Sequence, residues 1–324
     1  MSPTATVAIL TFNGERYLRD ILLALRTQRL DGEFEVLVID SGSTDSTLDI
    51  IAEFPEVRLH QIPNSEFGHG KTRNLAAQLA AGEFVVYLTH DAIPADDFWL
   101  ESLLAPFASF PGVVGVVGRH IPRPDCFPLL KYEIRRAFDS QGVDFATTIS
   151  YQDPKYDRDL RYGSPARLYF YSDVNSAARR RYLTEQLPYQ DVAYAEDQLF
   201  AEDFMTLGGL KAYTPWGAVI HSNDLSYSEY KKRLFDEFVG LRLAGAVMPP
   251  ASHGFRAFVR AVILDPIDIV QDREYSTARK LYWLLVNPFF HLAKFRSTRR
   301  ARRIDLSNPK VLEKLSLEAQ RKSA

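Results

Sequence analysis

The first 120 residues alternate between short apolar runs and segments in which apolar residues recur every three or four positions. The continuous apolar runs predict buried strands at residues 5–11, 34–40, 57–62, 84–89 and 113–118. The segments between them predict helices, of which the clearest occupy residues 15–27, 71–81 and 96–108. Continuous apolar strands that alternate with helices are typical of a mainly parallel sheet covered on both faces.

The pattern changes further along the chain. Residues 120–195 are irregular and rich in Pro, Arg, Tyr and Asp, which predicts long loops of the kind that often bind ligands. Residues 168–183 predict a strand that leads into a helix, and residues 195–209 predict a further helix. Residues 212–224 predict a strand, and residues 226–324 predict a helical tail. We therefore expect an α/β domain at 1–224, with halves at 1–120 and 121–224, and a helical extension at 225–324.

Composition excludes several classes of protein. A formal net charge of −2 argues against nucleic acid as a partner. The single cysteine, Cys126, excludes an internal disulfide and a thiolate zinc cluster. No signal-like leader precedes the first strand, and no apolar run reaches the roughly 18 to 20 residues of a membrane helix. A cytoplasmic protein is expected.

Positive charge is concentrated near the C-terminus. Residues 281–293 form an apolar, aromatic segment interrupted by Asn287 and Pro288, and residues 294–303 contain six basic residues and no acidic one. An aromatic segment followed by a basic cluster suits the surface of an anionic membrane. Residues 281–303 therefore either hold the protein at the inner face of the cell membrane or form a solvated helix face.

Polar residues follow three of the predicted strands at the point where each strand ends. They are Thr11-Phe12-Asn13, the segment 40–45 (DSGSTD) and the segment 89–92 (THDA). In open parallel sheets, ligands bind at the carboxyl ends of the strands. The first turn lacks G-x-G-x-x-G, and no phosphate-binding G-x-x-x-x-G-K-[ST] occurs, which argues against a dinucleotide fold and a P-loop. Asp91 is then either a ligand residue or simply the end of a buried strand.

The adjacent acids Glu196 and Asp197 are the sharpest local feature. Asp197 begins a helical stripe that is otherwise apolar, formed by Phe200, Phe204 and Leu207. In the first turn of a helix the macrodipole favours the ionised form. A charged carboxylate on a buried face is what a general base needs. The alternative is the ordinary preference of acidic residues for helix N-termini.

Two histidines occupy positions suited to anionic ligands. His221 ends an apolar strand and is either a ligand of a metal or phosphate, or a structural hydrogen-bonding residue. His69 lies in FGHGKTRN beside Lys71 and Arg73, a cationic loop that leads into a helix N-terminus. That loop either binds an anion or is an ordinary glycine-rich connection.

Taken together, the motifs resemble the family-2 glycosyltransferases with the GT-A fold, and within them a bacterial rhamnosyltransferase-like group. The resemblance rests on VAILTFNGERYL, VIDSGSTDST, FGHGKTRN, YLTHDAIP, SDVNSAARR, AEDQLF and WGAVIHSND, in the family's order across residues 5–224. Each motif alone is weak, and the seven in order indicate the family.

The resemblance implies a nucleotide-sugar site built from the strand ends and the cationic loop. Its expected members are Thr11, Phe12, Asn13, Asp40, Ser41, Gly68, His69, Lys71, Arg73, Asn74, His90 and Asp91. Asp91 matches the last acid of the family's D-x-D motif, with Thr89 in the first position. Ser41 stands where many members carry a second acid, and it is expected to tune base recognition toward deoxythymidine.

The resemblance also implies the chemistry. Asp197, beside Glu196, matches the catalytic acid of the E-D motif and is expected to deprotonate the acceptor hydroxyl during an inverting displacement. Asp91 and His221 are expected to hold a divalent cation, Mg²⁺ or Mn²⁺. Asp173 and Asn175 are expected near an acceptor or sugar hydroxyl.

The expected donor is dTDP-rhamnose, and the expected acceptor is a bacterial surface polysaccharide or its lipid-linked glycan precursor. Two alternatives stay open from the sequence. One is a UDP-hexose donor for the same fold, and the other is a non-catalytic protein that binds nucleotide sugars.

Overall fold

The structure is a computed structural model that describes residues 3–153, 168–192, 194–223, 225–243 and 251–305, together with residue 315. The chain divides into two compact units. The first comprises Met1–Ile121, Arg135–Val192 and Glu196–His221, and the second comprises Pro122–Ile134, Ala193–Ala195 and Ser222–Ala324. The second unit thus includes short segments from the middle of the chain. Separate functions for residues 1–224 and 225–324 stay a prediction.

Within the described residues, nine strands form one sheet in the first unit. They are β1 (Ala5–Thr11), β2 (Phe34–Asp40), β3 (Val57–Gln61), β4 (Phe84–Thr89), β5 (Ile93–Pro94), β6 (Val113–Ile121), β7 (Thr148–Ser150), β8 (Asn175–Arg179) and β9 (Leu210–Ile220). Their order is β3-β2-β1-β4-β8-β6-β9-β5, and β7 pairs with β9. The first four strands are mutually parallel, β6 is parallel to β9, and β8 runs antiparallel between β4 and β6. β5 and β7 are short strands that pair antiparallel with β9. The predicted mainly parallel sheet is confirmed for its main strands, with β8 inserted among them as an antiparallel strand.

The apolar runs in the sequence arise because both faces of the sheet are covered. Along β1, Val7 and Ile9 point to one face while Thr6 and Ala8 point to the other, and all four are fully buried. The bounds of β1, β2 and β4 coincide with the predicted strands, whereas β6 continues beyond its predicted end at residue 118 to Ile121.

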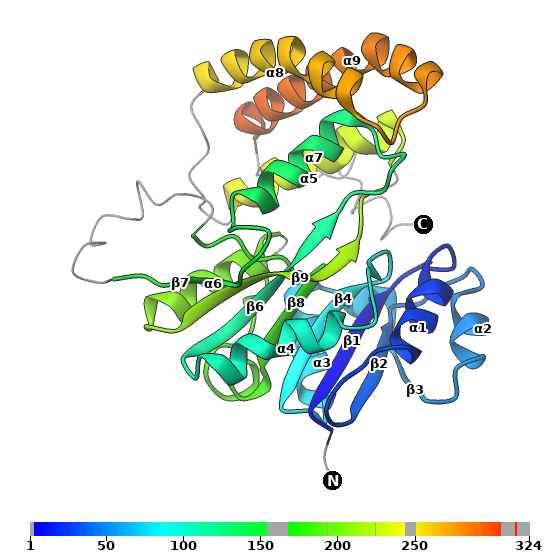
Figure 1. The fold of residues 1–324 in the computed structure, drawn as a ribbon, viewed down its shortest axis with the longest axis vertical. Helices are drawn as coiled ribbons and strands as arrows, with labels where there is room; N and C mark the ends of the chain where they lie inside the picture. The colour runs from blue at the N-terminus through cyan, green and yellow to red at the C-terminus, as the bar shows by residue number, and fades with distance from the viewer. Residues whose placement is uncertain are drawn as a thin grey trace. The chain divides into compact units, whose positions relative to one another are not determined.

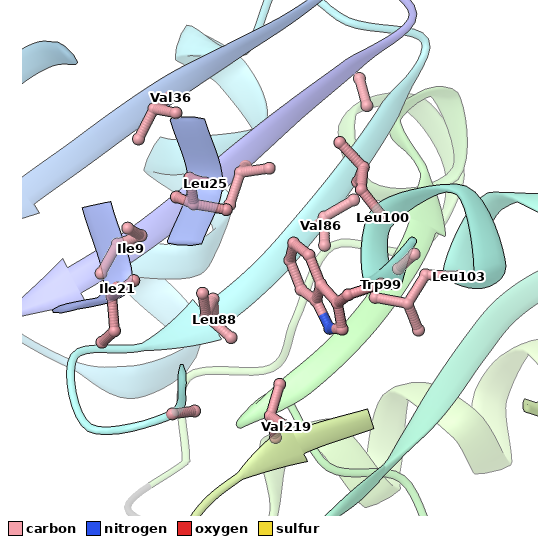
Figure 2. Close-up of a cluster of buried hydrophobic side chains, with 14 of the residues drawn as sticks. Ile9, Ile21, Leu25, Val36, Val86, Leu88, Trp99, Leu100, Leu103 and Val219 are labelled. Carbon is pink, nitrogen blue, oxygen red and sulfur yellow. The ribbon is translucent and has the colours of Figure 1, made fainter. Parts of the chain in front are cut away.

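Helices cover both faces of this sheet (Figure 1). On one face, α1 (Leu18–Arg26), α2 (Thr47–Ala52) and α4 (Trp99–Ser109) contribute to the main apolar core. Figure 2 shows members of this core, among them Ile21 of α1 and Trp99 of α4. On the other face lies α3 (His69–Leu79), where the Tyr87 hydroxyl donates a hydrogen bond to the main-chain oxygen of Arg73 (2.9 Å). The remaining elements of the first unit are α6 (Glu196–Thr206), a 3-10 turn at Asn64–Glu66 and a π-helical turn at Tyr182–Gln186.

The second unit is helical and has a core of its own. It contains α7 (Tyr227–Leu243), α8 (Ala251–Gln271), α9 (Thr277–Arg303) and the beginning of α5 (Pro128–Asp139). Phe127 and Phe290 stack in this core with ring centroids 4.5 Å apart. Of the helices described, none is both long enough and apolar enough to cross a membrane.

Candidate active site

The register of the parallel strands brings the predicted site residues to one edge of the sheet. Thr11, the last residue of β1, pairs with Asp40, the last residue of β2. Leu10 pairs with Thr89, the last residue of β4. The loops that follow these strands therefore leave the sheet side by side.

The strands on the other side of β4 reach the same edge. Because β8 is antiparallel to β4, its first residue, Asn175, pairs with Leu88, and Asp173 precedes it at that edge. β6 and β9 are parallel and end together, which places His120 near the end of β6 and His221 directly after β9.

Asp40 orders the loop after β2. Its carboxylate accepts hydrogen bonds from the hydroxyls of Thr11 (3.0 Å) and Ser43, and from the main-chain N–H groups of Gly42 and Ser43 (3.0 Å each). Four bonds fill the acceptor capacity of a carboxylate. Since Asp40 is also fully buried, its role in this structure is to fix the shape of the loop after β2.

The turn after β1 is held against this loop. Asn13 accepts a hydrogen bond on Oδ1 from the main-chain N–H of Thr44 (2.8 Å), and the Ser41 hydroxyl donates to the main-chain oxygen of Thr11 (3.0 Å). Phe12 is half-buried between them. Asn13 adopts a left-handed conformation with φ of 51°. Strain of this kind in a non-glycine residue concentrates at functional sites.

Asp91 lies just after β4 and contacts His221. Its Oδ2 is 3.3 Å from His221 Nε2, and its Oδ1 accepts a hydrogen bond from the Thr89 hydroxyl (2.7 Å). Burial disfavours the ionised carboxylate, but the facing His221, together with His90 and Thr89, outweighs burial and holds the pKa of Asp91 far below its ordinary value. The surroundings of Asp91 therefore favour its negatively charged form.

His120 belongs to this cluster and was missed by the sequence interpretation. Its ring centroid lies 5.3 Å from that of His221. Burial and the nearby His221 hold the pKa of His120 well below its ordinary value, so the ring is neutral. Its buried Nε2 has no hydrogen-bond partner among the described residues. The signal that could have found it is the strand end, because β6 runs through His120.

Arg73, Asp173 and Glu196 form a buried charged cluster. The Arg73 Nε lies 3.1 Å from Asp173 Oδ2, and its Nη1 pairs with Glu196 Oε1. Burial works against the charge of Arg73, but Glu196 and Asp173 outweigh it and raise the pKa of Arg73 above its ordinary value. The guanidinium thus pairs with two acids, and its predicted contact with a nucleotide sugar stays a prediction.

Asp197 lies in the first turn of α6, beside this cluster. Its Oδ2 accepts a hydrogen bond from the main-chain N–H of Asp173 (3.3 Å). Burial, followed by the charges of Glu196 and Asp173, raises the pKa of Asp197 to about 8. The expectation that the helix macrodipole would favour the ionised form is therefore wrong, because burial and two neighbouring acids outweigh the dipole.

The rest of the predicted α6 stripe is partly confirmed. Phe200 and Phe204 are buried, whereas Leu207 follows the last residue of α6 and is exposed. Ala195, which immediately precedes α6, has a positive φ of 64°. Asn13 and Ala195 are the non-glycine residues with positive φ in the described part of the chain, and each adjoins a predicted site residue.

The predicted cationic loop forms the N-terminus of α3. Gly68 precedes the helix, His69 begins it, and Lys71 is exposed. The side chain of Asn74 holds Tyr189, since its Nδ2 donates to the Tyr189 oxygen and its Oδ1 accepts from the Tyr189 N–H, both at 2.8 Å. Asn74 therefore has a structural contact, while Gly68, His69 and Lys71 lie at a helix N-terminus, which favours anions.

Asn175 is fully buried and makes three side-chain hydrogen bonds within the protein. Its Nδ2 donates to the main-chain oxygens of Gly217 (2.7 Å) and Arg119 (3.2 Å), and its Oδ1 accepts from the Trp99 indole (2.9 Å). These contacts hold Asn175 within the protein, and its expected place near an acceptor or sugar hydroxyl stays a prediction.

A complete metal site made of side chains is not found in the described residues, since no three or more His, Cys, Asp or Glu groups are arranged to hold an ion. Asp91 and His221 supply two suitable groups, and the buried His221 Nδ1 has no hydrogen-bond partner in that part of the chain. Mg²⁺ commonly takes one or two protein carboxylates and completes its shell with phosphate oxygens and water. The two residues therefore fit a cation that arrives together with a diphosphate.

Comparison with known proteins adds a family and a fold. Residues 6–185 match the family model described as Glycosyl transferase family 2. The chain is 28% identical over 233 residues to the O-antigen chain rhamnosyltransferase RfbN of Salmonella typhimurium, covering 71% of this chain and 70% of that protein. It is 31% identical over 206 residues to the O-antigen chain rhamnosyltransferase WbaN of Salmonella anatum, covering 62% and 61%.

Among solved structures, the fold resembles the mannosyltransferase PcManGT of Pyrobaculum calidifontis in complex with GDP-Man and Mn²⁺. That match has a TM-score of 0.54 at 18% identity and covers 100% of this chain and 84% of the other. The structure of TarS residues 1–349 from S. aureus in complex with UDP matches with a TM-score of 0.53 at 18% identity, covering 98% and 87%. The predicted GT-A fold is confirmed.

Proposed function

The chain belongs to glycosyl transferase family 2, and on that premise we propose that it is an inverting enzyme that transfers rhamnose from dTDP-rhamnose. The acceptor is a hydroxyl of a bacterial surface polysaccharide or of its lipid-linked glycan precursor. The names of two relatives, both O-antigen chain rhamnosyltransferases, support this donor and this class of acceptor. We assign the transfer to residues 1–224, with the nucleotide bound by 1–120.

The observation that carries the proposal is the environment of Asp197. A carboxylate whose pKa is raised to about 8 is a stronger base than an ordinary aspartate and is matched to catalysis near neutral pH. In the proposed step Asp197 accepts the proton of the acceptor hydroxyl while that oxygen bonds to the anomeric carbon. The bond from that carbon to the diphosphate oxygen breaks with its electron pair, and dTDP leaves.

The remaining residues position the donor. The loops after β1 and β2, ordered by Asp40 and Asn13, contact the base and ribose. Gly68, His69 and Lys71, at the N-terminus of α3, face the diphosphate. Arg73, with Glu196 and Asp173, holds Asp197 in place.

Asp91 and His221 would hold a divalent cation, Mg²⁺ or Mn²⁺, together with the diphosphate. When bound, that cation supplies positive charge that stabilises the leaving diphosphate. The permanent negative charge of Asp91 and its contact with His221 support this assignment.

Slow hydrolysis of the donor in the absence of acceptor tests the proposal. The purified protein is incubated separately with dTDP-rhamnose, UDP-glucose, UDP-galactose and GDP-mannose, and release of nucleoside diphosphate is measured. Release from dTDP-rhamnose alone is expected. Release from a UDP-hexose instead would reassign the donor, and no release from any of the four, with Asp197→Asn as the blank, would contradict an enzymatic role.

A further inference from the structure

Helix α8 exposes a row of apolar side chains to solvent. The row consists of residues three or four positions apart, namely Phe255, Val259, Ile263, Ile267 and Val270. Ile263 is 63% exposed and Val270 is 58% exposed. The side of α8 that carries Asp265 and Ile269 is buried instead. This helix therefore presents two apolar sides, and the core of the second unit covers one of them.

Helix α9 carries a similar exposed row, which is apolar in its first part and basic in its last part. The exposed residues are Leu281, Leu285 and Phe289, and at the same helical spacing they are followed by Arg296, Arg299 and Arg303. Trp283 and Phe290 point the other way, into the core. The aromatic segment at 281–293 is thus divided, because one side of the helix packs in the core and another side is exposed.

The two rows lie on the same side of the α8–α9 pair. The helices are antiparallel, since Phe255 contacts Phe295 (ring centroids 6.0 Å apart) and Lys280 Nζ donates to the Val270 oxygen (2.7 Å). They also meet where His291 Nε2 lies 2.7 Å from Asp265 Oδ2. Each residue of a helix turns the side-chain direction by about 100°. Counted in this way from Asp265 on α8 and from His291 on α9, the exposed row of each helix lies roughly a third of a turn away, in the same direction of rotation. In an antiparallel pair this geometry places both rows on one face.

A cavity beside α9 adds a site for an anion. Its volume is about 390 Å³, and α7 and α9 contribute four cationic side chains to its lining, Lys231, Lys232, Arg296 and Arg300. Ser297 and Tyr227 also line it, and no acidic side chain of the described residues does. Clustered lysine and arginine side chains suit an anion such as phosphate. Arg296 belongs both to this cavity and to the exposed row of α9.

We propose that the face formed by these two rows docks on an anionic phospholipid bilayer, with the phosphate of a lipid headgroup in the cavity between α7 and α9. The apolar rows would enter the boundary between headgroups and acyl chains, and the arginines would contact the headgroups. A second copy of the chain is a poorer partner for this face. The two rows contain no acidic residue, so a two-fold contact, which buries the same patch of both copies, would offer the arginines of this face no acidic partner.

Vesicle flotation with the full-length protein tests the proposal. We expect binding to vesicles of phosphatidylcholine mixed with phosphatidylglycerol, weak binding to phosphatidylcholine alone, and loss of the difference in high salt. The triple variant Arg296→Gln/Arg299→Gln/Arg303→Gln should bind the anionic vesicles about a hundredfold more weakly, at about fivefold for each arginine. Ile263→Ser/Leu285→Ser should weaken binding by about tenfold or more.

The control combines Leu23→Ser and Arg181→Gln, matched changes at exposed positions of the first unit, and should bind as the wild type does. Equal binding to neutral and anionic vesicles would overturn the proposal, as would a dimer in sedimentation that Ile263→Ser/Leu285→Ser converts to monomer. The salt dependence of vesicle binding by the wild-type protein tests the proposal even if a variant does not fold. Hydrolysis of the donor is measured without vesicles, so the two proposals can fail separately.

Discussion

Asp91 and Asp197 are the same kind of side chain in the same unit, and their surroundings shift their pKa values in opposite directions. Asp91 faces His221, which helps to hold its pKa far below the ordinary value. Asp197 adjoins Glu196 and Asp173, which together with burial raise its pKa to about 8. Two acids whose pKa values are pushed apart are suited to different chemical roles.

Charged neighbours decide the direction in which the pKa of each carboxyl group shifts. Burial disfavours the ionised form of both carboxyl groups. At Asp91 a histidine reverses that effect, whereas at Asp197 two further acids add to it and Arg73 offsets them in part. We therefore assign permanent charge to Asp91 and proton transfer to Asp197.

The largest expected effect comes from Asp197→Asn. Without a base, the rate of transfer should fall by about 10²–10⁴-fold, while calorimetry should give an unchanged nucleotide affinity. Glu202→Gln, an equivalent change on the same helix, is the control and should transfer normally. Near-normal turnover by Asp197→Asn would remove the base assignment.

Arg73→Gln should lower the free energy of unfolding by about 3–5 kcal/mol, because it leaves two buried acids without their cation. Urea denaturation measures this change. Arg19→Gln, which breaks the exposed ion pair with Glu53, should cost less than about 1 kcal/mol. Similar losses in the two variants would mean that the Arg73 cluster is not held together by charge.

Asp91→Asn should weaken donor binding in the presence of Mn²⁺ by about tenfold or more, since even the outer-shell partners of metal sites have effects of that size. Calorimetry with and without Mn²⁺ separates this effect from general loss of binding. If the wild type binds the donor equally well in both conditions, Asp91 does not act through a cation.

Activity and stability should also depend on pH through Asp197. Because Asp197 must be deprotonated to act, kcat/KM should rise with pH and level off above about 8. Between the ordinary pKa of an aspartate and about 8, the folded protein binds more protons at this position than the unfolded chain, so its contribution to stability falls as pH rises. Asp91 has the opposite sign, since its contribution is present above its ordinary pKa and is lost as pH falls.

Thermal unfolding of Asp197→Asn across the same pH range checks this sign. The variant should lose the fall in stability between the ordinary aspartate pKa and about 8 that the wild type shows. An identical pH profile in the two proteins would mean that Asp197 does not titrate as proposed.

Much of the fold could be predicted from local patterns. The bounds of β1, β2 and β4 follow from continuous apolar runs, and polar residues directly after them mark the functional edge of the sheet. The same reasoning failed at β6, because the predicted strand stops at residue 118 whereas β6 continues to Ile121. His120 was therefore missed. It also did not predict the antiparallel β8, because a strand's direction depends on which neighbour it pairs with.

Patterns along the chain were enough to predict β1, β2 and β4, the family and the strand-end or helix-start positions of Asp91, Asp197 and His221, because each depends on the order of residues. They did not predict α5 and β7, which lie where long loops were expected. What the site residues can do depends on contacts that form only in the folded chain. Arg73 comes from α3, Asp173 precedes β8 and Glu196 begins α6, and their distances set the proton affinity of Asp197. No periodicity in the sequence encodes those distances, because electrostatic interaction depends on separation in space and not on spacing along the chain.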